Sequence, residues 1–162
     1  MKTLKKTRQW AFIFLTFLAA YILIILPLPN SWQWVRPEFL TLVLIYWIFV
    51  QPHFVGIAMA WCAGLVMDIL YGGILGQYAL SLVIIAFLAR LLRYRIRIMP
   101  AWQQVIMIFT LLTIGRSVIF LVQWMSGNPP KLIYYCVPLF TSVICWPWMR
   151  RLMNFYERKV LA

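Results

Sequence analysis

The stretch that decides the fold is Gly64-Leu-Val-Met-Asp68-Ile-Leu-Tyr-Gly72-Gly73-Ile-Leu-Gly76, in which small residues and one acid recur every four positions. Four residues make slightly more than one helical turn, so such residues form a stripe along a helix. The whole stripe comprises Gly56, Ala60, Gly64, Asp68, Gly72 and Gly76. Small residues in a stripe let helix backbones approach closely inside a bilayer. Two uses remain open, namely packing between the protein's own helices and docking of a partner's membrane helix.

Asp68 is the one acid inside a long apolar run, and a carboxylate at bilayer depth normally faces protein or a water-filled cavity. Arg116 lies in another apolar run, and both residues are expected in the outer half of the membrane. A direct Asp68–Arg116 ion pair is therefore one hypothesis. The alternative is that Asp68 caps the broken helix end at Gly72 and Gly73 by binding backbone amides there. A proton-carrying Asp68 is a third interpretation, but no second intramembrane acid offers a relay.

The composition excludes an ordinary soluble domain. Of 162 residues, 65% are hydrophobic and 11% are charged, whereas soluble domains are about half apolar and about a quarter charged. A soluble core could not hide so much apolar surface, and the 17% of aromatic residues exclude a disordered basic tail. The chain is therefore expected to be an all-α integral membrane protein.

The apolar runs and their breaks predict six transmembrane helices within a single domain that covers residues 1–162. A span needs about 20 apolar residues. The predicted spans are approximately 10–28, 38–51, 54–71, 74–92, 100–125 and 132–149, followed by an interfacial amphipathic tail at 150–162. The short second span is expected to be tilted or half-length. The first is expected to stay uncleaved, because its apolar part is longer than that of a signal peptide.

The formal net charge of +12 comes from basic residues grouped by position. Twelve of the fifteen lie in three clusters, which are Lys2, Lys5, Lys6 and Arg8; Arg90, Arg93, Arg95 and Arg97; and Arg150, Arg151, Arg158 and Lys159. Six crossings place all three clusters on one side of the membrane. The positive-inside rule makes that side cytoplasmic, together with both termini.

The cluster between the fourth and fifth spans is expected to form a cytoplasmic basic face that meets anionic lipid headgroups. An additional protein partner for this face remains open. Nucleic acid is excluded as a partner, because only Tyr94 interleaves with the arginines where stacking of bases would need several aromatic side chains.

No residue pattern points to catalysis. Only short breaks separate the apolar runs, which leaves no room for a soluble catalytic domain, and no phosphate-binding loop occurs. His53 stands alone, and Cys62, Cys136 and Cys145 form no ligand-spaced motif. The sequence therefore predicts no enzyme activity, no catalytic residue, no cofactor and no metal site.

Several motifs together resemble the rod shape-determining protein MreD family over nearly the whole chain. They are the Gly64/Asp68/Gly72/Gly76 pattern, Arg36-Pro37 followed by Tyr46-Trp47, Trp102-Gln103-Gln104 and Trp146-Pro147-Trp148. Arg116 is not part of the family pattern, so any role for it is particular to this sequence.

The resemblance implies a multi-pass scaffold protein of the bacterial cell inner membrane, within the elongation (rod) complex. Such a protein would bind MreC and support lateral peptidoglycan synthesis and rod cell shape. MreB and the peptidoglycan synthase pair RodA and PBP2 would be further members of the complex. The resemblance also implies the fold of the S-components of energy-coupling-factor transporters, and no enzymatic activity.

The implied S-component fold keeps a second function open, that of a small-molecule-binding membrane protein or transporter subunit. Such a protein needs a polar-lined pocket that is reachable from outside. The polar candidates for its lining are Gln77, Tyr78, Thr110, Thr113 and Ser117. In a scaffold protein, we expect packed side chains in place of such a pocket.

Overall fold

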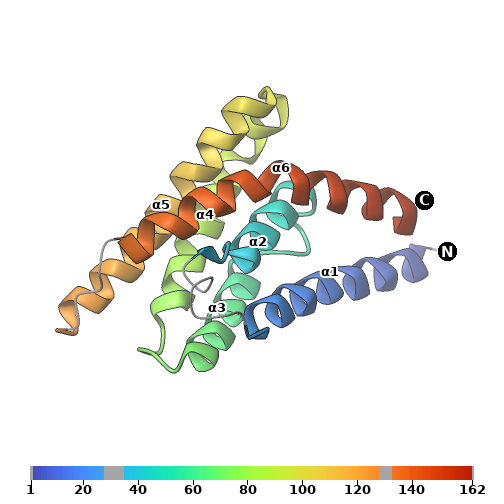
Figure 1. Ribbon diagram of the computed structural model, residues 1–162. Helices are drawn as coiled ribbons and strands as arrows, with labels where there is room; N and C mark the ends of the chain where they lie inside the picture. The colour runs from blue at the N-terminus through green and yellow to red at the C-terminus, as the bar shows by residue number, and fades with distance from the viewer. Residues whose placement is uncertain (1, 28–34, 128–132, 162) are drawn as a thin grey trace.

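The computed structural model describes residues 2–27, 35–127 and 133–161, and all of its regular structure in these ranges is helical. The helices are α1 (Lys2–Ile25), α2 (Phe39–Val50), α3 (Ile57–Tyr71), α4 (Gln77–Ile98), α5 (Ala101–Met125) and α6 (Ile133–Leu161) (Figure 1). The expectation of an all-α chain with six helices is confirmed for the described residues.

Helix lengths separate the six elements into two groups. Among the described residues, Thr7–Ile25, Gln77–Arg95 and Ala101–Met125 are long and apolar enough to cross a membrane. Helices α2 and α3 are apolar but have only 12 and 15 residues. At 1.5 Å per residue they span about 18 and about 22 Å, less than the hydrocarbon thickness of about 30 Å.

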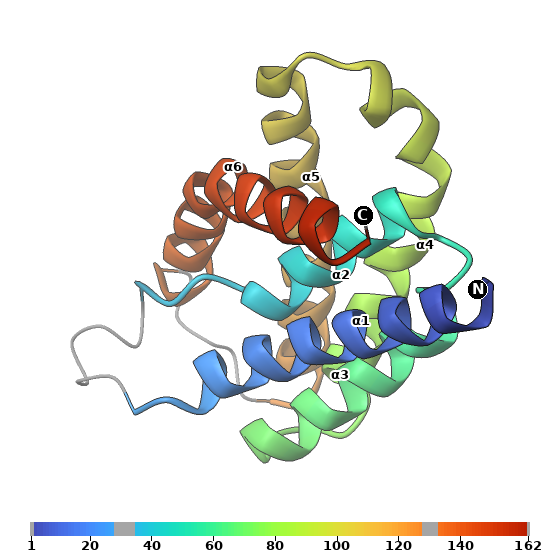
Figure 2. The same ribbon diagram turned by 90° about the vertical axis from the view of Figure 1, so that its right-hand side faces the viewer.

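Helix α2 forms the centre of the bundle and contacts α1, α4 and α6. Nine consecutive residues of α2, from Leu40 to Ile48, are buried. A helix that is apolar on all sides is stable only when other elements surround it, and Figure 2 shows α2 running between α1 and α6. The indole Nε1 of Trp47 donates a hydrogen bond to Thr16 Oγ1 at 2.9 Å, which joins α2 to α1.

Consecutive helices run in alternating directions through the bundle (Figures 1 and 2). Helices α1, α3 and α5 end at one end of the bundle, and α2, α4 and α6 end at the other. In Figure 1, α1 begins and α6 finishes at the right, and α4 finishes at the top; we call this upper right side of the bundle the basic end, because the three basic clusters lie in these helix segments.

Helices α4 and α5 approach each other closely at Gly115. A Cβ atom at this position would lie 2.3 Å from the Cδ1 atom of Ile85 and 2.9 Å from the Oγ atom of Ser81. The Ser81 hydroxyl donates to the Gly115 carbonyl at 2.9 Å. The absence of a side chain thus permits both the contact and the hydrogen bond, as is typical of membrane helices.

Two helices continue beyond the predicted spans. Helix α4 includes the arginine-rich stretch up to Ile98, and α6 runs without interruption into the tail that was expected to be a separate interfacial segment. Arginine and leucine are good helix formers, so the charges end the apolar run without ending the helix. Pro138 and Pro147 lie within α6, and Figure 1 shows this helix bending along its length, as helices do at proline.

Candidate functional site: the Asp68 hairpin and the Glu38–Arg116 pair

Two glycines with left-handed backbone conformations reverse the chain between α3 and α4. Gly72 follows the last residue of α3 with φ of +60°, and its amide donates to the Ile69 carbonyl at 3.3 Å. Gly76 precedes α4 with φ of +99°. Side chains disfavour both conformations, so glycine at these two positions allows α4 to turn back tightly against α3.

The Asp68 carboxylate binds the first backbone amides of α4. Its Oδ1 accepts from the Tyr78 amide at 2.8 Å, and its Oδ2 accepts from the amides of Gly76 at 2.9 Å and Ala79 at 3.3 Å. Amides at the start of a helix lack partners within the helix and form the positive end of the helix dipole. Asp68, which is only 1% exposed, thus caps α4 from within α3.

Gly64, one helical turn before Asp68, lies directly against the backbone of α4. A Cβ atom here would be 2.3 Å from Ala79 Cα and 2.6 Å from Ala79 N, so α3 and α4 touch through their main chains. At Gly56, by contrast, a Cβ atom would meet nothing within 4 Å. The close approach is therefore a property of the Gly64–Asp68 segment and not of the whole stripe.

The stripe predicted from the sequence divides into two parts. Ala60, Gly64 and Asp68 are buried within the chain's own bundle, whereas Gly72 is exposed, and Gly56 and Gly76 are half-buried at turns. A partner's helix could reach Gly64 and Asp68 only by displacing α4. The capping hypothesis placed the amide partners at Gly72 and Gly73, but the structure places them at the start of the next helix.

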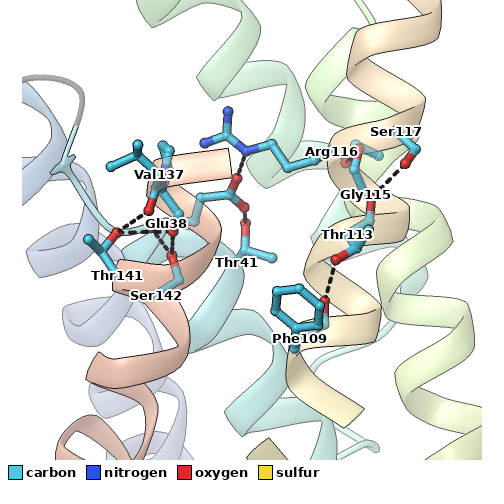
Figure 3. A network of polar contacts seen from close by, with 12 residues as sticks. Glu38, Thr41, Phe109, Thr113, Gly115, Arg116, Ser117, Val137, Thr141 and Ser142 are labelled. Atoms are coloured by element: carbon cyan, nitrogen blue, oxygen red, sulfur yellow. Dashed lines mark hydrogen bonds and ion pairs between the residues drawn. The ribbon is translucent and has the colours of Figure 1, made fainter. Parts of the chain in front are cut away.

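Arg116 pairs with Glu38 and not, as hypothesised, with Asp68. The Arg116 Nε donates to Glu38 Oε1, and both side chains are 17% exposed (Figure 3). The other carboxylate oxygen of Glu38 accepts from Thr41 Oγ1 at 3.0 Å, and the Glu38 amide donates to Ser142 Oγ at 2.8 Å. This cluster joins the start of α2 to α5 and α6.

The pair with Glu38 was missed because this acid stands at the very start of the predicted span 38–51, and only Asp68 was counted as an acid inside an apolar run. Helix α2 has only 12 residues, and its start lies close enough to α5 for Glu38 to reach Arg116. The signal was present in the sequence as an acid that immediately precedes a 12-residue apolar run. Nearby, Arg36 donates to the carbonyls of Ile24 and Leu26 at the end of α1, where a helix dipole favours a cation.

The predicted basic face lies along the last turns of α4. The side chains of Arg90 and Arg95 are exposed, and Arg93 is half-buried with its guanidinium carbon 5.6 Å from the centre of the Tyr94 ring. The side chain of Arg97 lies outside the described residues. At the same end, Arg150 donates to the side-chain carbonyl of Gln104, which links α6 to the start of α5.

The polar residues proposed as a pocket lining do not converge on one space. Gln77 accepts from the Gln123 amide group at 3.3 Å, and the Tyr78 backbone binds Asp68. The hydroxyls of Thr110, Thr113 and Ser117 each donate to a carbonyl four residues earlier in α5. Within the described ranges, no three residues among His, Cys, Asp and Glu gather as potential metal ligands.

Replacing Asp68 should destabilise the start of α4. Asp68→Ala leaves three amides without their acceptor and should lower the free energy of unfolding by at least about 3 kcal/mol, since each of the three orphaned groups costs about 1–3 kcal/mol. Asp68→Asn keeps one acceptor oxygen and should lose less. Thermal unfolding in detergent and hydrogen exchange at Gly76, Tyr78 and Ala79 measure both effects. The control is Ile69→Ala, whose side chain is 69% exposed. Equal exchange in wild type and Asp68→Ala would contradict the cap.

Exchanging the charges of Glu38 and Arg116 should distinguish the observed Glu38–Arg116 pair from the hypothesised Asp68–Arg116 pair. Each single reversal leaves like charges together and should cost about 3 kcal/mol of unfolding free energy. The double variant Glu38→Arg/Arg116→Glu should recover part of this loss in thermal unfolding. Asp68→Arg/Arg116→Asp should recover none. The reverse outcome, with recovery only in the second double variant, would show that Arg116 pairs with Asp68.

Comparisons with known proteins confirm the family resemblance. The family model described as rod shape-determining protein MreD matches residues 4–156. The Rod shape-determining protein MreD of Haemophilus influenzae is 31% identical over 152 residues, which cover 94% of each chain. No solved structure matches. The chain thus belongs to the rod shape-determining protein MreD family.

Proposed function

We propose that the protein is a scaffold component of the elongation (rod) complex in the bacterial inner membrane. In this role it binds MreC and supports lateral peptidoglycan synthesis, with MreB, RodA and PBP2 as further members of the complex. Membership of the MreD family carries the proposal, because the family is one of shape-determining structural proteins.

The contacts of the charged side chains within the bundle support a structural role. Asp68 binds the start of α4, and Glu38 and Arg116 join α2, α5 and α6. Each of these groups fixes the position of helices within the bundle. The alternative, a small-molecule binder or transporter subunit of S-component type, would need polar side chains that converge on a pocket. The hydroxyls of α5 instead bind their own helix backbone.

The proposed arrangement in the membrane is multi-pass, with six crossings and both termini in the cytoplasm. Two observations support it. The helices alternate in direction, and the basic clusters belong to the segments at one end of the bundle (Figure 1). The positive-inside rule then orients the basic end towards the cytoplasm. The short helices α2 and α3 cross as part of a locally thinned or tilted arrangement.

Co-purification with MreC tests the proposal. Wild-type protein, extracted in mild detergent with tagged MreC from the same organism, should be recovered as a stoichiometric complex. Ile69→Ala should behave as wild type, whereas Asp68→Ala should reduce recovery because it loosens the α3–α4 hairpin. Size-exclusion profiles of each variant alone report its folding.

Two outcomes would count against parts of this account. Absence of any wild-type complex with MreC would overturn the proposed scaffold function. Full recovery with Asp68→Ala, at normal expression and with a normal elution profile, would show that the hairpin is not needed for binding MreC.

A further inference from the structure

Helices α4 and α5 leave an apolar groove between them near the basic end. The groove has a volume of about 350 Å³. Residues that line it along its length include Leu88, Leu92 and Met99 on one side and Gln103, Thr110 and Ile114 on the other. Figure 2 shows the two helices diverging towards this end. The Thr110 hydroxyl donates to the Ile106 carbonyl at 3.0 Å, so it presents no unmet donor to the groove.

The length of the groove matches one leaflet of a bilayer. Along α4 the rise from Leu88 to the last residue, Ile98, is about 15 Å, and along α5 the rise from Gln103 to Ile114 is about 16 Å. Half of the hydrocarbon core is about 15 Å. A partner's transmembrane helix would contact the bundle over the full thickness, whereas a lipid tail inserts from one side only. The dimensions therefore favour an acyl chain as the occupant.

The positively charged side chain of Arg95 lies near the end of the groove that is closest to the end of α4. Arg95 follows Leu88 by seven positions and Leu92 by three, so it lies on the same face of α4 as these two lining residues. Its side chain is exposed. Arg90 is also exposed but follows Leu88 by two positions, which turns it to another face.

Exposed aromatic side chains mark the same level of the bundle. Tyr94 near the end of α4 and Trp102 at the start of α5 are both largely exposed. Tyrosine and tryptophan concentrate where the hydrocarbon meets the headgroups. The apolar groove thus reaches the headgroup level, with an accessible arginine in line with it.

We propose that this groove binds one anionic glycerophospholipid of the cytoplasmic leaflet. One acyl chain lies between α4 and α5, and the phosphate group contacts Arg95. The choice of leaflet rests on the orientation given under Proposed function, while the binding chemistry rests on the groove and Arg95 alone.

Native mass spectrometry of the full-length protein released from lipid nanodiscs tests the site. The nanodiscs contain phosphatidylethanolamine and phosphatidylglycerol in both leaflets, so the result does not depend on orientation. Wild-type protein should retain one phosphatidylglycerol in preference to phosphatidylethanolamine. Arg95→Ala should reduce the retained phosphatidylglycerol several-fold, and Arg90→Ala, which removes the same charge from another face, should not.

A second pair of variants tests the acyl chain. Thr110→Phe fills the groove and should reduce retention of either lipid, whereas Ser117→Phe, at an exposed position of α5 outside the groove, should leave it unchanged. Each variant is first compared with wild type in elution profile. Equal losses in Arg95→Ala and Arg90→Ala, or retention by Thr110→Phe at the wild-type level, would overturn the proposal.

The lipid site and the scaffold function fail independently. If the wild-type protein shows no preference for phosphatidylglycerol but still forms the MreC complex, only the proposed lipid site is overturned. A retained preference without an MreC complex would leave the lipid site standing and remove the proposed scaffold function.

Discussion

The hydrogen bonds from the first amides of α4 to the Asp68 carboxylate are the interaction on which the rest of the bundle depends. In hydrocarbon no water replaces a missing partner, and each unsatisfied backbone group costs several kcal/mol. A helix that starts inside the bundle therefore needs an acceptor for its first amides. Asp68 provides two oxygens, and Gly64 lets the backbone of α4 come near enough to reach them.

The position of α4 then determines that of several other helices. Helix α4 contacts α2, α3 and α5. Because Asp68 fixes where α4 begins, it also determines how these three neighbours are placed along α4. Helix α5 packs closely against α4 at Gly115. The next residue, Arg116, pairs with Glu38 at the beginning of α2. Glu38 in turn donates its amide to Ser142 of α6. The charged side chains of Asp68, Glu38 and Arg116 thus link helices in succession, including helices that are far apart in the sequence.

The sequence was sufficient to predict the helices and the burial of Asp68 in the α3–α4 hairpin. It was not sufficient to predict which groups Asp68 and Arg116 contact. Apolar length and glycine breaks are local properties, so the six helices followed from them, and an acid within an apolar run indicated a buried, satisfied Asp68. The pairing of Arg116 was wrong because Asp68 was taken as the one acid within the apolar runs, although Glu38 stands at the start of the second span. Which of the two acids meets Arg116 depends on how α2 packs among its neighbours, and apolar length alone does not give this.

The most direct test of the Asp68 cap is a distance measured in a lipid bilayer. Solid-state NMR of protein labelled with ¹³C at the carboxylate of aspartate and with ¹⁵N at tyrosine amides and arginine side chains reports dipolar coupling between these nuclei. The Asp68 cap predicts strong coupling between the Asp68 carboxylate and the Tyr78 amide, whose nitrogen lies 2.8 Å from Oδ1. Coupling of this carboxylate to the Arg116 guanidinium, without coupling to the Tyr78 amide, would contradict it.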